Sequence, residues 1–230
     1  MDGMTESQTS LIVEDVLLLL FQPSSGTIAG EGTLFYVLGG GALTDLALDQ
    51  RIEIDDRTGL TGRLVRAVGS APPADPLLAQ VWNLVAEKPR NAQTLLAAAG
   101  PKLRGAVLDR LVERGHLRRE SRKTLGLFTT TALRDGGTSR RAELLQRVRA
   151  VLVDGAAPDP RTAALGALLS ASGSLPSFDP EIPWSTPVIT RAKELERGEW
   201  GADAVDDAVA RTVAVTAMGT LVALGVITPN

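Results

Sequence analysis

Basic side chains concentrate in one stretch of the chain, between Gly100 and Arg134. The stretch holds nine basic and three acidic residues, a net charge of +6, whereas the whole chain carries −3. The bases are Lys102, Arg104, Arg110, Arg114, Arg118, Arg119, Arg122, Lys123 and Arg134. A basic segment on an acidic body favours an anionic partner, which could be phospholipid headgroups, nucleic acid or an acidic protein. The alternative is a solvated face with local pairing, such as Arg110 with Glu113.

Apolar residues stand beside the basic turn of this stretch. Leu125, Leu127 and Phe128 lie within five residues after Lys123. Each Lys or Arg near an anionic leaflet contributes about 1 kcal/mol to binding, and apolar side chains next to basic ones suit a shallow interfacial anchor. The same three apolar residues could instead form the inward face of a core strand or a surface for self-association.

The sequence offers little for enzymatic chemistry. It has no cysteine and a single histidine, His116, so thiolate zinc sites, cysteine nucleophiles and His-rich metal sites are excluded. Acids pair at Asp45/Asp49 and Asp206/Asp207, but helical acids spaced by four usually form a solvated face or pair with arginine. We therefore predict a protein that is not an enzyme and needs no cofactor or metal. His116 follows a helix-ending glycine, which suggests the start of a hairpin, or less directly a pH-dependent headgroup contact.

The elements that position these residues are mostly helical. Only 3% of the 230 residues are aromatic, so the core must be built from Leu, Val and Ala, and Ala and Leu favour helices. Apolar periodicity predicts a mainly α fold, a single helical-bundle domain decorated with β-hairpins. Helices are expected after a Ser10 cap and over residues 33–54, 77–87, 91–100, 102–114, 140–153, 160–170, 186–198 and 202–224. Hairpins are expected within 51–68 and 116–133.

Three consecutive glycines, Gly39, Gly40 and Gly41, lie inside the second predicted helix. Each costs a helix about 1 kcal/mol relative to alanine. Together they predict close approach by another helix or by a ligand. They do not form a nucleotide-binding loop, because the G-x-x-x-x-G-K-[ST] pattern is absent.

The sequence also bears on location. The first ten residues, MDGMTESQTS, are acidic and polar, unlike a signal peptide. The uncharged stretch from Thr212 has an apolar part of about 16 residues, shorter than the roughly 20 needed to span a bilayer. We expect a cytoplasmic protein that meets membranes only at their cytoplasmic face.

Several blocks together resemble the Golgi phosphoprotein 3 family. They are LIVEDVLLL near the N-terminus, LGGGALTDLALDQRIEI, LRGAVLDRLVERGHLRRE and TRAKELERGE. Each is similar to a family segment, and their order and spacing are kept from about residue 10 onward. The Ala- and Arg-rich composition is typical of a GC-rich genome, so we expect a bacterial, actinobacterial member.

The resemblance implies one domain over residues 10–230, preceded by a disordered N-terminus at 1–9. It implies binding of phosphatidylinositol 4-phosphate at a basic pocket, a hydrophobic hairpin that dips into the bilayer, and an adaptor role with a protein cargo. Homo-oligomerisation stays open. Arg104 matches a phosphate-pocket arginine of the family, whereas two companion positions hold Pro101 and Gly39, with Lys102 adjacent. The expected lipid phosphate-binding residues are Arg104, Lys102, Arg118, Arg119, Arg122 and Lys123.

A different function is compatible with the middle of the chain. Three helices followed by a basic hairpin, from Leu77 to Leu133, match a winged-helix pattern in which the third helix enters the major groove. Lys102, Arg104, Arg114, Arg118 and Arg119 would then contact DNA. The acidic pI of 5.3 and the acids Asp109 and Glu113 on that helix make nucleic acid the less favoured partner.

Overall fold

The computed structural model describes residues 10–59, 62–124 and 128–200, together with residues 210, 212 and 214. At the tips of the two long hairpins, residues 56–62 and 122–130, no side chain is described. Several predictions fall outside the described residues: the N-terminal segment 1–9, the apolar residues Leu125 and Leu127, and the acids Asp206 and Asp207. Of the predicted helix 202–224, only residues 210, 212 and 214 are described.

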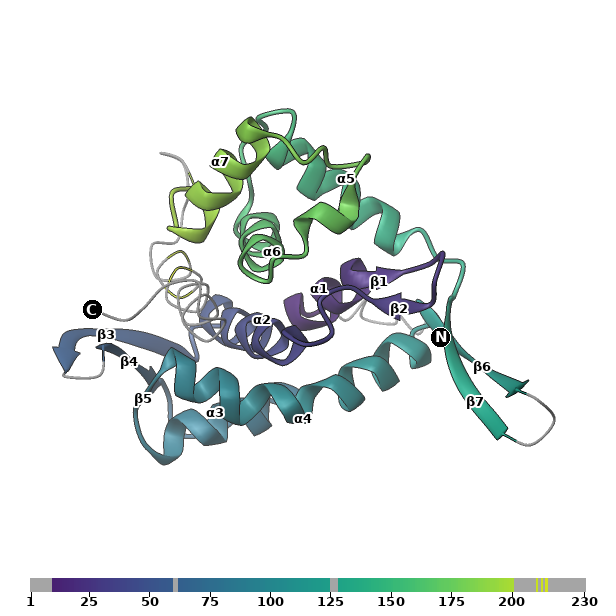
Figure 1. Ribbon diagram of the computed structural model, residues 1–230. Coiled ribbons are helices and arrows are strands. Elements are labelled where there is room, and N and C mark those ends of the chain that lie inside the picture. The colour runs from purple at the N-terminus through teal and green to yellow at the C-terminus, as the bar shows by residue number, and fades with distance from the viewer. Residues whose placement is uncertain are drawn as a thin grey trace, which may run out of the picture.

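Helices build the body of the molecule in three layers (Figure 1). The helices α1 and α2 form the middle layer, with α3 and α4 on one side and α5, α6 and α7 on the other. Their bounds are α1 Ile12–Leu20, α2 Leu34–Leu48, α3 Pro76–Glu87, α4 Ala92–Glu113, α5 Arg140–Leu152, α6 Pro160–Ala171 and α7 Thr186–Glu196, with a short 3-10 helix at Leu175–Phe178. The prediction of a mainly α fold with β-hairpins is confirmed.

Short antiparallel strands complete the described fold. They are β1 Phe21–Gln22, β2 Thr27–Ile28, β3 Ile52–Gly59, β4 Gly62–Ala67, β5 Arg90–Asn91, β6 Leu117–Thr124 and β7 Phe128–Asp135. The predicted hairpins correspond to β3–β4, to which β5 adds a third strand, and to β6–β7. The two project from opposite ends of the body (Figure 1). Within the described part of the chain, no helix combines the length and the apolar character needed to cross a bilayer.

The helix α1 is the centre of the core, and all nine of its residues are buried, including two acids, Glu14 and Asp15. A buried helix start must satisfy its free N–H groups. Asp45 of α2 does so from outside the helix, because its two carboxylate oxygens accept from the N–H groups of Ile12 and Val13 at 2.8 and 3.1 Å. At the other end, Arg141 of α5 donates to the carbonyl oxygens of Phe21 and Leu19, the latter in α1's last turn.

These contacts correct two expectations about acids and caps. Asp45 was expected on a solvated face or paired with arginine; its side chain is buried, so the solvated face is wrong, whereas a long ion pair with Arg161, at 3.9 Å, is present. The carboxylate also ties α2 to the start of α1. Ser10 does not cap α1. The helix begins after Leu11, and the Ser10 hydroxyl bonds to the carboxylates of Glu14 and Asp15.

The glycines of α2 serve close helix packing, one of the two roles expected for them. A Cβ on Gly41 would lie 2.9 Å from the Cα of Val13 in α1. A Cβ on Gly39 would lie 3.2 Å from the Cα of Leu96 in α4. The helix therefore presents one glycine to each of its two neighbours, which lets both backbones approach it.

The helical prediction for residues 91–114 is wrong in one respect. Two helices separated at Gly100–Pro101 were expected, but the structure has one, α4, which runs through Pro101 without a break. Gly100 lies at a close contact with α2, because a Cβ there would stand only 1.9 Å from the carbonyl oxygen of Phe35. The glycine is needed for a helix crossing and does not end a helix. With only α3 and α4 before the basic hairpin, the three-helix arrangement of a winged helix is not formed in this region.

Candidate functional site

The helix α4 carries the first group of predicted site residues. The Asn91 side chain caps it by accepting from the N–H of Thr94 at 2.8 Å, and Gly115 ends it with a positive φ of 73°. Leucines and valines at helical spacing face the core, so the remaining faces are exposed. Lys102 and Arg104 are both exposed but leave the helix in different directions, since residues two apart do not share a face.

The two bases differ in their partners. Arg104 Nε donates to Glu31 Oε1 at 2.6 Å, and both side chains are about half exposed. Lys102 has no acidic partner among the residues that the structure describes. The predicted helper of Arg104 is thus a separate cation on the neighbouring side of the helix.

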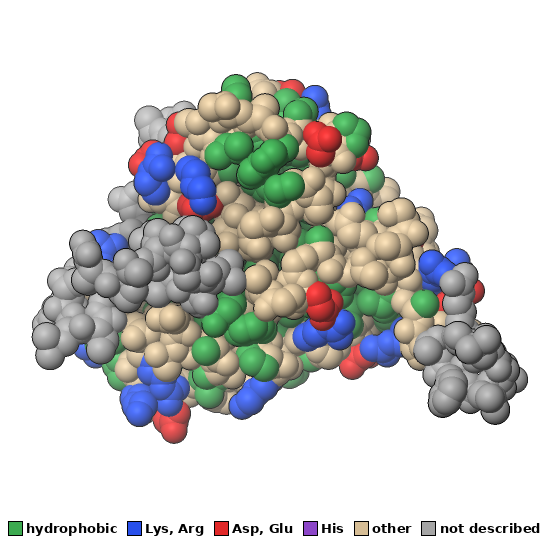
Figure 2. Space-filling view, in the orientation of Figure 1, with side chains coloured by type: hydrophobic (Ala, Val, Ile, Leu, Met, Phe, Trp, Pro, Cys, Tyr) green, Lys and Arg blue, Asp and Glu red, His purple; other side chains and the backbone are tan. Residues whose placement is uncertain are grey.

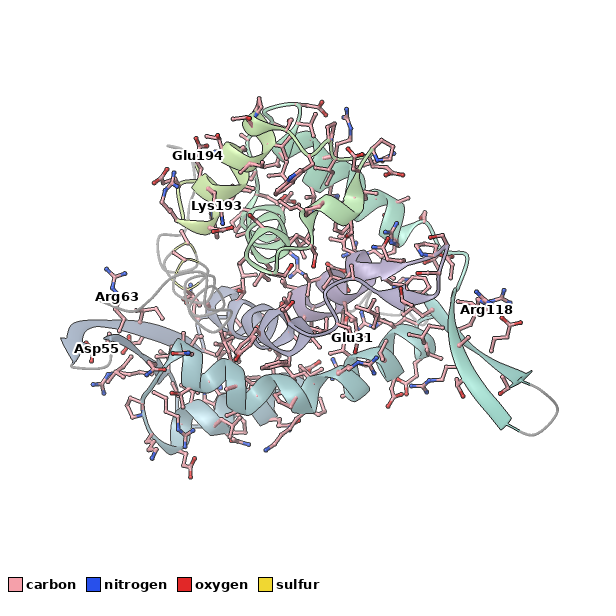
Figure 3. All side chains as sticks on the ribbon, in the orientation of Figure 1. Glu31, Asp55, Arg63, Arg118, Lys193 and Glu194 are labelled. Atoms are coloured by element: carbon pink, nitrogen blue, oxygen red, sulfur yellow. The ribbon has the colours of Figure 1, made fainter. Side chains whose placement is uncertain are left out.

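The hairpin β6–β7 carries the second group. Among residues 117–121, the part of β6 whose side chains are described, only Leu117 is buried, and Arg118 and Arg119 are exposed on opposite sides of the strand. Arg119 bonds to Asp109 of α4 at 2.5 Å, which ties the hairpin root to the helix. Arg118 points away from the body (Figure 3) and has no acidic partner within the described residues.

The rest of the predicted site lies near the hairpin tip. Arg122 and Lys123 belong to β6, paired with Thr130 and Thr129 across the ladder, and Phe128 begins β7 opposite Thr124. Their side chains are not described. Leu125 and Leu127 lie outside the described residues, so the proposed membrane-inserting role of these three apolar residues stays a prediction.

Acids neutralise more of the basic stretch than the sequence indicated. On the face seen in Figure 2, Lys and Arg side chains lie in separate groups, several of them against Asp or Glu, and do not form one continuous patch. Of the seven bases whose side chains the structure describes, five bond to acids, and those acids include ones far away in sequence. The pairs are Arg104 with Glu31, Arg110 with Asp75 and Glu14, Arg114 with Glu14, Arg119 with Asp109 and Arg134 with Glu120.

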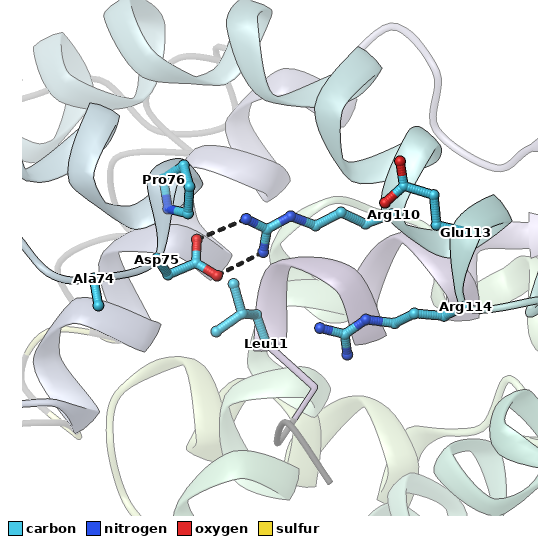
Figure 4. Close-up of a pocket in the computed structure, with 7 residues that line it drawn as sticks. All are labelled: Leu11, Ala74, Asp75, Pro76, Arg110, Glu113 and Arg114. Atoms are coloured by element: carbon cyan, nitrogen blue, oxygen red, sulfur yellow. Dashed lines mark hydrogen bonds and ion pairs between the residues drawn. The ribbon is translucent and has the colours of Figure 1, made fainter. Parts of the chain in front are cut away.

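Two of these arginines face a hollow of about 490 Å³ between the starts of α1 and α3 and the end of α4 (Figure 4). Arg110 donates two parallel hydrogen bonds to Asp75, at 2.7 and 2.8 Å. Burial alone would raise the pKa of Asp75, but these bonds and the N–H groups of Leu78 and Leu77 hold it below its usual value. Arg114 reaches the buried Glu14 at 3.1 Å. Both arginines are engaged inside the protein, so neither is a free contact for phosphate.

The buried acid pair of α1 is the feature that sequence reasoning missed. Glu14 binds Arg110 and Arg114 from α4, whereas Asp15 binds Arg140 from α5 at 2.7 Å and Arg161 from α6 at 3.5 Å. The available signal was the position of the two acids inside LIVEDVLLLL, where every neighbour within two residues is apolar. Charged groups that are fully buried are expected to be paired.

His116 lies at the hairpin root and not on the basic surface. Its Nδ1 is 2.8 Å from the Thr138 hydroxyl, a contact that closes the root, since Thr138 lies beyond the end of β7. Partial burial and then the nearby Arg140 and Arg114 lower the pKa of His116 below its usual value. The expected position at the start of the hairpin is confirmed.

The architecture and the charged edge define a class: a layered helical protein with a projecting basic hairpin. Residues 12–212 match the family model described as Golgi phosphoprotein 3 (GPP34). The match covers most of the chain, so this chain belongs to the Golgi phosphoprotein 3 family. No curated protein sequence matches it.

Proposed function

We propose that the protein binds anionic phospholipid headgroups, including those of the phosphatidylinositol 4-phosphate type, and lies peripherally on the cytoplasmic face of a membrane. The binding surface of this proposal is the basic edge, defined as Lys102, Arg104, Arg118 and Arg119 together with the hairpin β6–β7. Membership in the Golgi phosphoprotein 3 family supports it. In this proposal the role is binding, with the protein acting as an adaptor for a protein cargo, and not catalysis.

The observation that carries the proposal is the pair of unneutralised cations on this edge. Lys102 and Arg118 are exposed and have no acidic partner in the described part of the chain, and Arg118 stands on a hairpin that leaves the body (Figures 1 and 3). A projecting ribbon can reach a flat surface before the acidic body does. Arg122 and Lys123 extend the same strand toward the tip.

The binding free energy of such a contact is a sum of modest contributions from single residues. Each basic residue near an anionic leaflet contributes about 1 kcal/mol and loses this within a screening length of about 8 Å at physiological salt. Lys102, Arg118 and the bases at the hairpin tip would therefore attract the anionic surface through their summed positive charge. Arg104 would in addition hydrogen-bond a headgroup phosphate directly. Leu125, Leu127 and Phe128 would add shallow apolar insertion, or else a surface for homo-oligomerisation.

Sedimentation with vesicles tests the proposal. Wild type would be compared on neutral, phosphatidylserine-containing and phosphatidylinositol 4-phosphate-containing vesicles, at low and physiological salt. Arg118→Gln should weaken binding to anionic vesicles roughly fivefold, the equivalent of one cation at the surface. The matched control is Arg63→Gln, because Arg63 is also an exposed arginine, in β4 of the opposite hairpin. It should have little effect.

The outcomes separate three cases. Preference for the phosphorylated lipid that is lost in Arg104→Ala supports a headgroup pocket. Binding to any anionic vesicle that salt removes supports a generic electrostatic anchor. The proposal fails if wild type does not pellet with anionic vesicles at low salt, and parallel titration with duplex DNA would then test the remaining anionic partner.

A further inference from the structure

Arg104, an arginine of the basic edge that can bind a phosphate directly, is already bonded within the protein. Arg104 Nε donates to Glu31 at 2.6 Å, and the side chains are 46% and 52% exposed. No other hydrogen bond or ion pair of Arg104 is present among the described residues, so its terminal nitrogens remain open to a ligand. Glu31 likewise has Arg104 as its partner there.

The pairing is set by how α2 crosses α4. The two helices run antiparallel and make backbone contacts in steps of four residues: Gly39 meets Leu96, and Phe35 meets Gly100. Residues four apart lie above one another on a helix face. One further step, just before α2 and along α4, brings Glu31 to Arg104. The rigid helix crossing therefore delivers a carboxylate to this guanidinium.

The segment that holds Glu31 is compact. Gly30 has a positive φ of 65° and its carbonyl accepts from the Thr33 N–H at 2.9 Å, while Gly32 has open space around it. This turn places Glu31 at the surface between the middle layer and α4 (Figure 3). The side chain is needed for no other described contact, so it can rotate away without disturbing the fold.

We propose that Glu31 is a built-in competitor for Arg104, because its carboxylate occupies the Nε and opposes the negative charge of any headgroup that approaches the open terminal nitrogens. This rests on the proposed function and adds a selectivity rule to it. A phosphomonoester carries a charge of about −1.5 to −2 and can accept two parallel bonds from a guanidinium. It outcompetes a single carboxylate, whereas a phosphodiester or serine headgroup with less charge on each group does so less well. Glu31 thus suppresses binding to ordinary anionic lipids at this position.

Vesicle binding by four proteins tests the competition: wild type, Glu31→Gln, Arg104→Gln and the double variant. Glu31→Gln should raise affinity for phosphatidylserine vesicles by up to about fivefold, the upper range for an exposed ion pair. The gain should be smaller on phosphatidylinositol 4-phosphate vesicles. In the Arg104→Gln background, the same change should add no more than a generic loss of negative charge would.

Glu113→Gln measures the gain in vesicle affinity that comes from the loss of one negative charge alone. Glu113 is an exposed acid of α4 that makes no described hydrogen bond or ion pair, so its removal changes the net charge without freeing an arginine. The proposed competition is wrong if wild type binds anionic vesicles and Glu31→Gln increases vesicle affinity no more than Glu113→Gln does. The proposed lipid binding still stands in that case. If none of the variants binds, the proposed lipid binding itself fails, and the competition fails with it.

Discussion

At the residue scale, the most consequential side chain is Asp45, which the fold uses as a cap supplied by a neighbouring helix. A helix start in a dry core leaves N–H groups that water cannot reach, and each unsatisfied group costs about 1–3 kcal/mol. Leu11 at the N-cap position of α1 offers no side-chain acceptor of its own. The acid that serves it is 33 and 32 residues away from the groups it accepts from.

Replacement of Asp45 by alanine should lower the free energy of unfolding by about 2–4 kcal/mol, because two buried N–H groups lose their acceptor. Urea denaturation measures this. Asp49→Ala is the matched control, since Asp49 is exposed at the end of the same helix and its side chain makes no described bond. It should change stability by less than about 0.5 kcal/mol. Equal effects of the two variants would contradict the capping role.

At the scale of elements, the crossing of α2 over α4 organises both the core and the candidate site. It depends on two glycines that meet the backbone of the other helix, Gly39 of α2 and Gly100 of α4, of which Gly100 is the tighter. The same helix has a second glycine, Gly105, with nothing within 4 Å of its hypothetical Cβ. Alanine at these two positions of α4 should therefore have opposite effects on stability, because Gly100 is at a close contact and Gly105 is not.

Gly100→Ala should destabilise the protein by at least 1–3 kcal/mol, roughly the cost of overpacking, because the new Cβ meets the Phe35 backbone. Gly105→Ala should stabilise it by about 0.5–1 kcal/mol, because alanine favours a helix and meets no obstacle. Thermal denaturation followed by circular dichroism compares the two. Stabilisation by both would mean that helix propensity, and not the close crossing with α2, decides the effect of alanine in α4.

The elements also show what the sequence can and cannot predict. Leucine periodicity, the Asp159–Pro160 start of α6 and Gly115 located most helices within one or two residues. The predicted helix end at Gly100–Pro101 was wrong. The sequence alone does not distinguish a glycine needed for a close helix crossing from a glycine that ends a helix. Charge counting found Arg104 and Arg119 but not their partners, since Glu31 is 73 positions away from Arg104.

At the scale of the whole molecule, two adjacent acids in α1 connect the outer layers. Glu14 bonds to α4, whereas Asp15 bonds to α5 and α6. The hairpin β6–β7 joins α4 to α5, and Arg114 and Arg140 flank its root, so the same cluster holds the hairpin on the body. Removal of one partner from a buried ion pair leaves a costly unpaired charge.

The two acids should have separable effects. Glu14→Gln should speed amide hydrogen exchange at the end of α4, and Asp15→Asn should do so in the first turns of α5 and α6, because each variant frees the arginines of one layer only. Exchange followed by mass spectrometry, segment by segment, distinguishes them. Identical exchange patterns in the two variants would mean that the cluster opens as one unit, contrary to the division between layers.

The pH dependence of stability tests the buried cluster as a whole. Burial raises the pKa of Asp45 from 3.8 to about 7, even though the N–H groups of Ile12 and Val13 and the charge of Arg161 oppose the rise, and Asp15 adds to it. A carboxyl whose folded pKa exceeds its unfolded pKa takes up its proton first in the folded state. Its contribution to stability therefore increases as pH falls from about 7 toward 3.8.

The prediction concerns the difference between wild type and Asp45→Asn, which cannot titrate at this position. That difference in unfolding free energy should shift in favour of wild type as pH falls through this window, by at most about 1.4 kcal/mol per unit. His116, with its lowered pKa, destabilises both proteins alike as they acidify, so its effect cancels. Asp75 and Asp159, whose pKa values are lowered, lose their stabilisation only below the window. A difference that stays constant, or that shifts toward the variant on acidification, would mean that the two N–H groups and Arg161 keep Asp45 ionised in the core.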